Sequence, residues 1–337
     1  MSVSAAIYGC EGLSLTEAEK RFFAEVRPWG FIIFARNIET PEQVKRLIGE
    51  LRAAAGHDAP VLIDQEGGRV ARLRPPHWRA YPAGRRFGEL YTRSKELGIE
   101  AARLGARLIA AELHALGINV DCLPVLDVPV PGAHDVIGDR AYGLTPEPVI
   151  ALGRAAAEGL LAGGVLPVIK HIPGHGRAGV DSHLSLPVVD ADRAALAATD
   201  FAPFKALADM PLAMTAHVVY TALDAGRPAT TSAKVISEVI RRDIGFDGFL
   251  MSDDLSMQAL AGTLAERARA SLAAGCDIVL HCNGKMDEML AIASEAPTLA
   301  GKALARSDAA LARLAPPAPL DESAGVARLD ELLSRLA

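Results

Sequence analysis

Short apolar runs that end in polar or charged residues recur along the whole chain. Their length, their β-branched residues and the turn residues around them are typical of buried β-strands. We expect strands at Ala5–Cys10, Phe31–Phe34, Pro60–Ile63, Ile118–Val125, Val165–Ile169, Pro211–Ala216, Phe249–Met251 and Asp277–Leu280.

Segments rich in Ala, Leu and Arg lie between these runs, and their apolar residues recur with a helical period. The clearest are Leu15–Val26, Pro41–Ala55, Arg93–Leu116, Pro146–Ala162, Asp192–Leu207, Ala233–Arg242 and Leu264–Ala274. Alternating strands and helices of this kind indicate parallel β/α units. The eight strands fit a single TIM-like (β/α)8 barrel of the α/β class better than an open sheet.

Nearly all the predicted strands end in polar side chains, and in such a barrel the C-terminal ends of the strands hold the active site. Two long connections rich in Pro and Gly, Pro75–Tyr91 and Val128–Tyr142, are expected to be loops at the rim of this face. We assign residues 1–315 to the barrel as the catalytic domain. Residues 316–337 are expected to form a Pro-rich segment and a short helix, Val326–Leu336, packed on the barrel.

The composition limits the possible partners and compartments. Half of the 337 residues (50%) are hydrophobic, which is enough for a large core. The formal net charge of -6 comes from well-mixed charges without the basic stripe of a nucleic-acid-binding protein. No segment has the length of a membrane span, and the N-terminus lacks the features of a signal peptide. The cysteines are predicted to be buried free thiols, as in a reducing compartment: Cys10, Cys122, Cys276 and Cys282. We therefore expect a cytoplasmic protein that is a monomer or a weak homo-oligomer.

The stretch Lys170–Pro187 changes abruptly in character after the apolar run that precedes it. Pro173 and Gly174 exclude a helix and indicate a loop. Such a loop needs solvent or specific partners for its polar groups, so this concentration of titratable side chains indicates a function beyond packing. The titratable residues are Lys170, His171, His175, Arg177, Asp181 and His183.

These histidines allow three interpretations. One or two of them can be structural, bonded to backbone carbonyls. A metal site is disfavoured, because Pro173 and Gly174 break the helix that would bring His171 and His175 to one face. A catalytic role is favoured for His183, because a carboxylate two residues earlier in an extended segment lies on the same side and orients the imidazole. That carboxylate is Asp181, and neither a metal nor a cofactor is expected.

Two adjacent aspartates follow the seventh predicted strand. Strand alternation puts Asp253 on the same side as Phe249 and Met251, and Asp254 on the opposite side. Only one aspartate therefore faces the barrel axis, and the other is a candidate N-cap for a helix over Leu255–Leu260.

Charged residues also follow the third predicted strand and lie in the second long connection. Asp64 and Arg72 flank a Gly-Gly turn, where a salt bridge between them is the structural alternative to ligand binding. Arg140 can clamp a hydroxyl, carbonyl or carboxylate group of a ligand. Its structural alternative is an ion pair with Asp135 or Asp139.

Taken together, five motifs of the chain resemble glycoside hydrolase family 3, and most of all its bacterial β-N-acetylglucosaminidase (β-hexosaminidase) branch. These motifs are IDQEGGRV, IGDRAYG, KHIPGHG, VDSH and MSDDLSM. The resemblance spans Phe31 to about Asn283, with Ile172 as a conservative departure where an aromatic residue is often seen. It implies a TIM-like barrel that hydrolyses terminal β-linked N-acetylglucosamine. In this branch the substrates are typically cytoplasmic muropeptides from cell-wall recycling.

The resemblance also implies roles for single residues. Asp253 matches the catalytic nucleophile, and His183 matches the general acid/base with Asp181 as its partner. The positions that match sugar-binding residues are Asp64, Arg72, Arg140, Lys170 and His171. This set predicts a retaining double displacement. A neutral imidazole is suited to act as the general acid/base. It adds no negative charge near the attacked carbon, and the usual pKa of histidine lies near working pH.

Four alternatives remain open from the sequence. The same chemistry with phosphate in place of water would make the protein a phosphorylase, and another sugar preference would make it a β-glucosidase or β-xylosidase of the same family. A metal-dependent barrel hydrolase would lose activity with a chelator. A sugar-binding barrel without activity would not turn over an aryl N-acetylglucosaminide.

Overall fold

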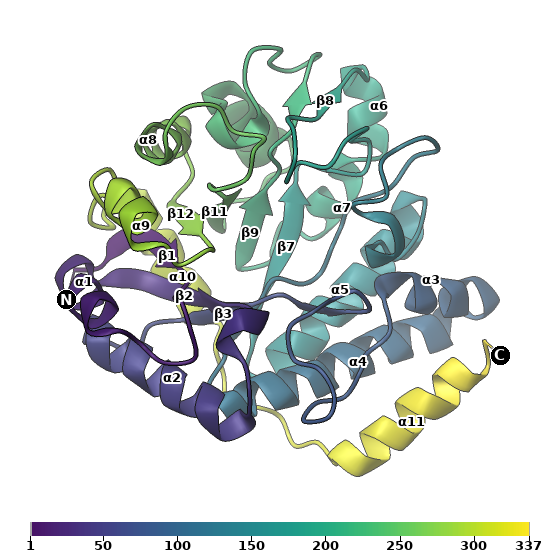
Figure 1. Cartoon of the computed structure of the whole chain (residues 1–337). Helices are drawn as coiled ribbons and strands as arrows, with labels where there is room; N and C mark the ends of the chain where they lie inside the picture. The colour runs from purple at the N-terminus through teal and green to yellow at the C-terminus, as the bar shows by residue number, and fades with distance from the viewer. Residues whose placement is uncertain (1, 337) are drawn as a thin grey trace.

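The computed structural model describes residues 2–336. Eight strands, each parallel to its neighbours, close into a barrel (Figure 1). The strands are β1 (Ser4–Tyr8), β2 (Pro28–Ile33), β3 (Val61–Ile63), β6 (Val120–Asp121), β7 (Leu166–Ile172), β9 (Leu212–Thr215), β11 (Phe249–Asp254) and β12 (Ile278–His281). Each predicted apolar run overlaps one of them, so the predicted TIM-like (β/α)8 fold is confirmed.

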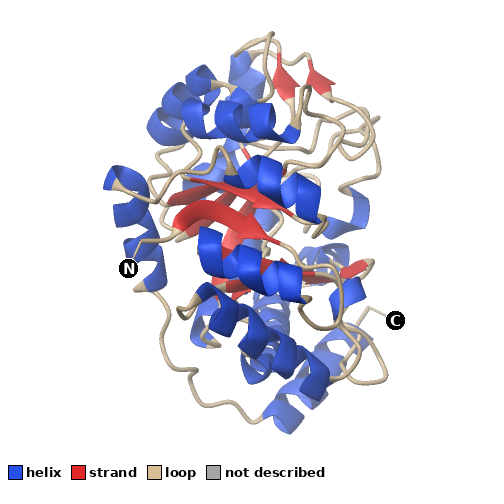
Figure 2. Ribbon diagram, turned by 60° about the vertical axis from the view of Figure 1, so that its left-hand side comes forward, coloured by secondary structure: helices blue, strands red, loops and turns tan. Residues whose placement is uncertain are grey.

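Helices surround the barrel and lie outside its strands (Figure 2). They are α1 (Glu17–Val26), α2 (Pro41–Ala55), α3 (Gly84–Arg93), α4 (Lys95–Leu116), α5 (Pro146–Ala162), α6 (Arg193–Ala198), α7 (Phe201–Ala206), α8 (Leu264–Ala274), α9 (Met286–Ala293), α10 (Gly301–Leu311), α11 (Glu322–Ser334) and the π-helix η4 (Val235–Asp243). Short 3-10 turns form η1 (Ala35–Asn37), η2 (Gly138–Arg140) and η3 (Ala229–Thr231). Two small sheets lie outside the barrel: β4 (Gln65–Gly67) with β5 (Val70–Ala71), and β8 (Val188–Val189) with β10 (Val219–Tyr220).

Several predicted elements differ from the structure at their boundaries. The first helix begins at Glu17, the C-terminal helix is Glu322–Ser334 and not Val326–Leu336, and α3 occupies the second half of the expected loop Pro75–Tyr91. Arg93 ends α3 and does not begin α4, because Ser94 has an extended backbone and its side chain accepts the N–H of Leu97 as an N-cap. The predicted helix Asp192–Leu207 is divided into α6 and α7. Pro203 lies in the first turn of α7, where the absence of a backbone N–H is tolerated.

Several strands differ in length from the prediction: β2 begins at Pro28 and not at Phe31, and β11 extends to Asp254 and not only to Met251. β6 contains only two residues of the predicted Ile118–Val125 run, since Pro124 has no N–H to donate to the ladder. β7 is longer than predicted and extends to Ile172. Lys170 and His171 are therefore strand residues, and the loop begins only at Pro173.

Alternating side chains of the strands divide the apolar core into two layers. Ile278 and Leu280 of β12 join the layer inside the barrel, whereas Val279 joins the layer between barrel and helices. At the N-terminal end of the barrel, Ser307 of α10 accepts the Nε1–H of Trp29 at 2.7 Å, and Ala310 joins the inner layer. The inner core thus fills one end of the barrel and leaves the C-terminal end of the strands to polar side chains.

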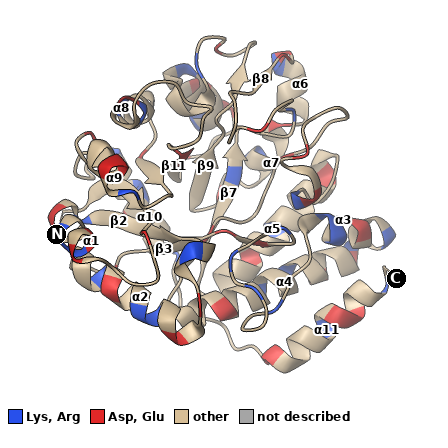
Figure 3. Cartoon of the chain, in the orientation of Figure 1, with Lys and Arg blue, Asp and Glu red and all other residues tan. Residues whose placement is uncertain are grey.

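The C-terminal helix α11 packs against α4. Leu329 and Leu332 are buried, and Arg328 forms an ion pair with Glu100 at 2.7 Å. In the view of Figure 3, Lys and Arg are interspersed with Asp and Glu over the helices. None of the helices within residues 2–336 combines the length and the hydropathy needed to cross a membrane.

Close backbone packing at Gly88 of α3 leads to a stability prediction. A Cβ added there would lie 1.7 Å from the carbonyl oxygen of Tyr142. We expect Gly88→Ala to lower the free energy of unfolding by about 3 kcal/mol, because the two backbones must move apart. The measurement is urea unfolding followed by circular dichroism.

Gly49→Ala in α2 is the matched control for this substitution. No atom lies within 4 Å of the added Cβ, so we expect unchanged stability or a gain of up to about 1 kcal/mol. Equal unfolding midpoints for both variants would contradict the role of the contact at Gly88.

Candidate active site

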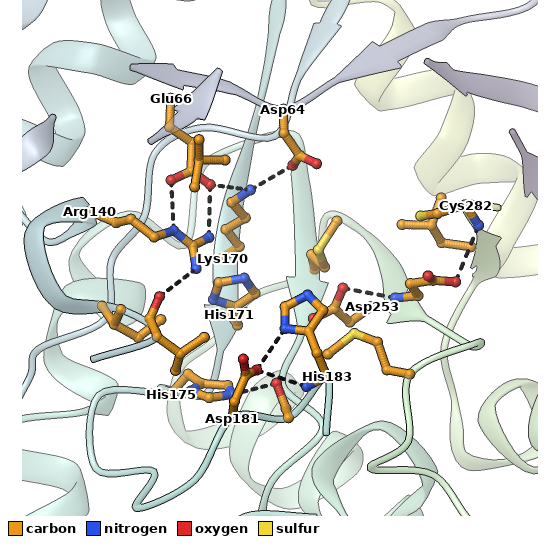
Figure 4. A pocket seen from close by; sticks show the side chains of 18 of the residues that line it. Asp64, Glu66, Arg140, Lys170, His171, His175, Asp181, His183, Asp253 and Cys282 are labelled. Atoms are coloured by element: carbon orange, nitrogen blue, oxygen red, sulfur yellow. Dashed lines mark hydrogen bonds and ion pairs between the residues drawn. The ribbon is translucent and has the colours of Figure 1, made fainter. Parts of the chain in front are cut away.

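A cavity of about 370 Å³ opens at the C-terminal end of the barrel strands (Figure 4). Side chains from strand ends, from η2 and from the loop between β7 and β8 line it together. All eight residues predicted from the sequence are among them: Asp64, Arg72, Arg140, Lys170, His171, Asp181, His183 and Asp253.

Five charged side chains form a continuous chain along one wall of the cavity. Arg72 Nη2 lies 2.9 Å from Asp64 Oδ2, and Lys170 Nζ lies 2.9 Å from Asp64 Oδ1. The same Nζ lies 2.7 Å from Glu66 Oε1. Arg140 binds Glu66 through both Nε and Nη2, each at 2.8 Å. We call these five residues the charged wall; its three cations and two carboxylates alternate and leave one net positive charge.

Opposite charges within the charged wall keep its groups ionised. Burial disfavours the charged form of Asp64, but Lys170 and Arg72 outweigh burial and hold the pKa of Asp64 well below its usual range. In the same way, Arg140 and Lys170 outweigh burial and lower the pKa of Glu66 to about 2. Burial would lower the pKa of Lys170, yet Asp64 and Glu66 raise it well above its usual value. The wall is therefore charged throughout the neutral pH range.

Asp127 organises the two histidines at the base of the Lys170–Pro187 loop. Its Oδ2 lies 2.7 Å from His171 Nδ1, and its Oδ1 accepts the backbone N–H groups of His171 at 3.2 Å and His175 at 2.6 Å. His175 Nε2 in turn lies 3.0 Å from Ser182 Oγ. Burial lowers the pKa of His175 to about 4, so this ring is neutral at neutral pH. His175 is thus held by a side-chain hydroxyl and not by the backbone carbonyl expected for a structural histidine, and it also lines the cavity.

Asp181 and His183 form a pair at the mouth of the cavity. Asp181 Oδ1 lies 2.7 Å from His183 Nδ1 and accepts the backbone N–H of the same residue at 2.9 Å. Burial opposes ionisation of Asp181, but these contacts lower the pKa of its carboxyl group. The imidazole of His183 is 63% exposed. Because Nδ1 faces the carboxylate, Nε2 is the ring nitrogen that can exchange a proton with a ligand.

Both aspartates of β11 line the cavity, although alternation predicts only one there, because the pairing of β11 with β12 shifts register between Met251 and Asp254. Phe249 and Met251 belong to the inner core layer, and Asp253, which has the same parity, lines the cavity. Burial opposes ionisation of Asp253, but the pKa of this carboxyl group is nevertheless lowered, mainly by His217 and His171. A carboxylate at this point is therefore ionised at neutral pH and faces any ligand in the cavity.

Asp254 fixes the turn after β11. Its Oδ1 accepts the N–H groups of Ser256 at 3.0 Å and Cys282 at 3.2 Å, and its Oδ2 accepts Ser256 Oγ–H at 2.5 Å. The expected helix over Leu255–Leu260 is wrong: these residues form turns. The reason is that Asp254 binds Ser256 two residues later and stabilises an Asx-type turn in place of a helical first turn.

Three residues of the site were missed in the sequence. Glu66 is the partner of Arg140, whereas an ion pair with Asp135 or Asp139 was expected; Asp139 instead binds Arg69 at 2.9 Å. Glu66 lies two residues after Asp64, and this spacing in an extended segment was a usable signal. Asp127 follows the fourth predicted strand and was a usable signal too. The third is His217, which also ends a predicted strand. It is buried; its Nδ1 lies 2.7 Å from Thr230 Oγ1 and its Nε2 lies 3.0 Å from the Asp254 carbonyl oxygen.

The metal hypothesis gains no support from the site geometry. Within residues 2–336, no three or more His, Cys, Asp and Glu side chains are grouped so as to hold a metal ion. Asp127 instead binds the imidazole of His171 and the backbone N–H of His175, and the His175 ring contacts Ser182.

The fold and the cavity define a class of protein. An ionised aspartate, an imidazole–carboxylate pair and a wall of charged donors and acceptors at the C-terminal end of a (β/α)8 barrel are the elements of a carbohydrate-hydrolysing barrel enzyme. Residues 13–315 match the model of the glycosyl hydrolase family 3 N terminal domain. The chain belongs to this family, which confirms the resemblance seen in the motifs.

Relatives within the family share most of their length with this chain. The β-hexosaminidase of Bordetella avium is 40% identical over 276 residues, which cover 81% of this chain and 78% of the relative. The β-hexosaminidase of Thioalkalivibrio sulfidiphilus is 42% identical over 287 residues, with 84% and 82% covered. The crystal structure of NagZ from Neisseria gonorrhoeae in complex with N-trifluoroacetyl-D-glucosamine is 33% identical and superposes with a TM-score of 0.89 over 99% of both chains.

Glu66 leads to a prediction about stability and its pH dependence. Glu66→Gln leaves Lys170 and Arg140 buried with less negative charge, so we expect a loss of about 3 kcal/mol in the free energy of unfolding at neutral pH. The folded-state pKa of Glu66 is lowered to about 2, so its contribution is present above the unfolded pKa of roughly 4.3 and is lost as the pH falls towards 2. Urea unfolding between neutral and acidic pH should therefore show the two stabilities converging.

Asp139→Asn is the control for Glu66→Gln. The Asp139–Arg69 pair is exposed, so its loss should change stability by less than about 1 kcal/mol. A gap between unsubstituted protein and Glu66→Gln that stays constant from neutral pH to pH 2 would contradict the assignment.

Proposed function

We propose that this protein, a glycoside hydrolase of the β-hexosaminidase type, removes terminal non-reducing β-linked N-acetylglucosamine by a retaining double displacement. The observation that carries the proposal is that Asp253 and the Asp181–His183 pair line one cavity together with the charged wall. One carboxylate is thus available for attack at carbon, and one imidazole for proton transfer.

In the first step, the Asp253 carboxylate attacks C1 of the sugar, and the bond from C1 to the leaving oxygen breaks. His183 Nε2 gives its proton to that oxygen, so the aglycone leaves as a neutral alcohol. The Asp181 carboxylate, 2.7 Å from Nδ1, holds the ring in position and stabilises its protonated form before transfer. The products of this step are a glycosyl ester on Asp253 and a neutral imidazole.

In the second step, the neutral imidazole of His183 accepts a proton from water while the water oxygen attacks C1. The ester bond to Asp253 breaks, and the carboxylate and the protonated His183 are restored. Two displacements at C1 return the sugar with its original anomeric configuration.

The proposed sugar-binding residues contact oxygen atoms of the sugar. They are Asp64, Arg72, Arg140, Lys170 and His171. Lys170 and the two arginines donate charge-assisted hydrogen bonds, and Asp64 accepts from hydroxyl groups. Because the charged wall is already assembled by its own ion pairs, these donors need little reorganisation when the sugar enters.

The proposed substrates are muropeptide fragments in the cytoplasm during cell-wall recycling. Sequence similarity to β-hexosaminidases along four fifths of the chain supports this setting, and so do the four free cysteines. The test is an assay of hydrolysis with three substrates, each with and without phosphate: aryl β-N-acetylglucosaminide, aryl β-glucoside and aryl β-xyloside. The preferred substrate and the product distinguish the proposal from its alternatives. Preference for the glucoside or xyloside, or a glycosyl phosphate product, would overturn it.

The first prediction here concerns the nucleophile. Asp253→Ala or Asp253→Asn should lower kcat by at least about 10⁴-fold without loss of fold, because the carboxylate proposed to attack C1 is removed. Asp254→Asn should retain far more activity, since its amide still offers an oxygen to Ser256 and Cys282. Intact-mass detection of a trapped glycosyl adduct, followed by peptide mapping, locates the nucleophile. An adduct on any residue other than Asp253 would reverse the assignment.

The second prediction separates His183 from its neighbours. His183→Ala should lose most activity on disaccharides and on poor leaving groups, yet retain more on aryl glycosides with very acidic phenols, which need no protonation. Azide should then accelerate turnover, because it attacks the glycosyl ester without a general base. Asp181→Asn should show the same pattern more weakly.

His175→Ala is the control for the second prediction. As a loop-packing residue bound to Ser182, His175 should affect stability or KM, and not the dependence on the leaving group. The measurement is kcat/KM for each variant across a series of aryl leaving groups. Equal losses across the series for His183→Ala, without azide rescue, would assign His183 a binding or structural role.

A further inference from the structure

A buried histidine whose ring nitrogens both lack a hydrogen-bond partner lies behind the barrel wall. His281 ends β12, and strand alternation points it outward, on the side of Val279. Its ring is 0% exposed, and neither ring nitrogen has a hydrogen-bond partner. Leaving such groups unpaired costs about 1–3 kcal/mol, so the position calls for a physical explanation.

Two carboxylates face this ring, one at each nitrogen. Nδ1 lies 4.0 Å from Asp254 Oδ1, and Nε2 lies 3.6 Å from Glu288 Oε2. Glu288 belongs to α9 and also binds Asn283 Nδ2 and Lys285 Nζ. The buried ring therefore lies between two partly exposed carboxylates and keeps them apart.

Asp254 connects this ring to the cavity. Its Oδ1, the atom that faces His281, accepts the N–H groups of Ser256 and Cys282. Its own N–H donates to Asp253 Oδ1 at 2.8 Å, and its carbonyl oxygen lies 3.0 Å from His217 Nε2. A displacement of the Asp254 carboxylate therefore shifts the peptide unit that holds the Asp253 side chain.

We propose that His281 is a positioning residue for the glycosidase reaction: from outside the barrel it fixes the Asp254 carboxylate, and Asp254 fixes Asp253 towards C1 of the sugar. This inference rests on the proposed role of Asp253 as nucleophile. The cavity is lined by Cys282 but not by His281, so His281 does not touch the substrate. Its effect therefore falls on the chemical step and not on sugar binding.

The test is steady-state kinetics of His281→Leu, which removes both ring nitrogens and keeps an apolar side chain of similar volume. We expect kcat to fall about tenfold with KM changed less than twofold, because small misplacement of a reacting group costs rate and not affinity. The fall should be the same for good and poor aryl leaving groups, since Asp253 attacks C1 in every case. This pattern differs from that expected for His183→Ala. His281→Gln keeps a donor and an acceptor and should recover part of the lost kcat.

Val279→Ala is the matched control, because Val279 lies on the same strand, faces the same side and is buried. It should lower the melting temperature and leave kcat unchanged. Glu288→Gln tests the other side of the ring at a partly exposed position, and we expect a smaller fall in kcat. The double variant His281→Leu/Glu288→Gln should be no worse than His281→Leu alone, because both act through the same ring.

The outcomes separate this inference from the proposed function. A kcat of folded His281→Leu within twofold of the unsubstituted enzyme, an equal loss in Val279→Ala, or a change confined to KM would overturn the role of His281. If His281→Leu does not fold, the role of His281 is tested with His281→Gln and Glu288→Gln. The same changes in kcat and KM then support or overturn it. Full activity of Asp253→Ala would instead overturn the nucleophile assignment, whatever the result at His281.

Discussion

The buried ammonium group of Lys170 holds the two halves of the cavity wall together. It is 3% exposed and lies between Asp64 at 2.9 Å and Glu66 at 2.7 Å. An ammonium group in this position is costly to desolvate, and only the two carboxylates offset that cost. Each carboxylate then needs a second cation, which Arg72 and Arg140 supply at the two ends. The segments that carry these side chains are therefore fixed relative to one another before any sugar enters.

The alternation of side chains along the strands determines which of them face the inside of the barrel and which face the surrounding helices. On β11, both Asp253 and Asp254 line the cavity, and Asp254 also binds the following turn and the start of the next connection. On β12, Leu280 faces inward and His281 faces outward, towards Asp254 and Glu288. Two polar layers thus lie on the two sides of the barrel wall, and the backbone of Asp253 and Asp254 is shared by both.

The features that were predictable from the sequence depend on local periodicity. The strand positions, the polar strand ends and the inward orientation of Asp253 all follow from the repeat of a β-strand. The position of Asp254 at the same cavity does not, because the pairing of β11 with β12 shifts register before it. The contacts that were missed join distant segments: Glu66 and Arg140 are 74 residues apart, and Asp127 and His171 are 44 apart. Asp135 and Asp139 lie nearer to Arg140 in sequence than Glu66 does. The closure of the barrel determines that Glu66 is the ion-pair partner. The turn after Asp254 was missed for the opposite reason, because a strictly local contact with Ser256 replaced the helix.

The two proposed catalytic groups are held in different ways, and the difference suits their tasks. Asp253 belongs to a barrel strand and, in the proposed mechanism, must reach a single atom, C1, of a sugar that the charged wall binds. His183 belongs to a loop, is 63% exposed, and must meet first the leaving oxygen and then water. The base of that loop is nevertheless fixed, since His175 binds Ser182 and the N–H of His134 in the rim loop donates to the Ala178 carbonyl at 2.8 Å. A fixed base with an exposed imidazole lets the proton donor face aglycones of different shape, while the attacking carboxylate keeps one geometry.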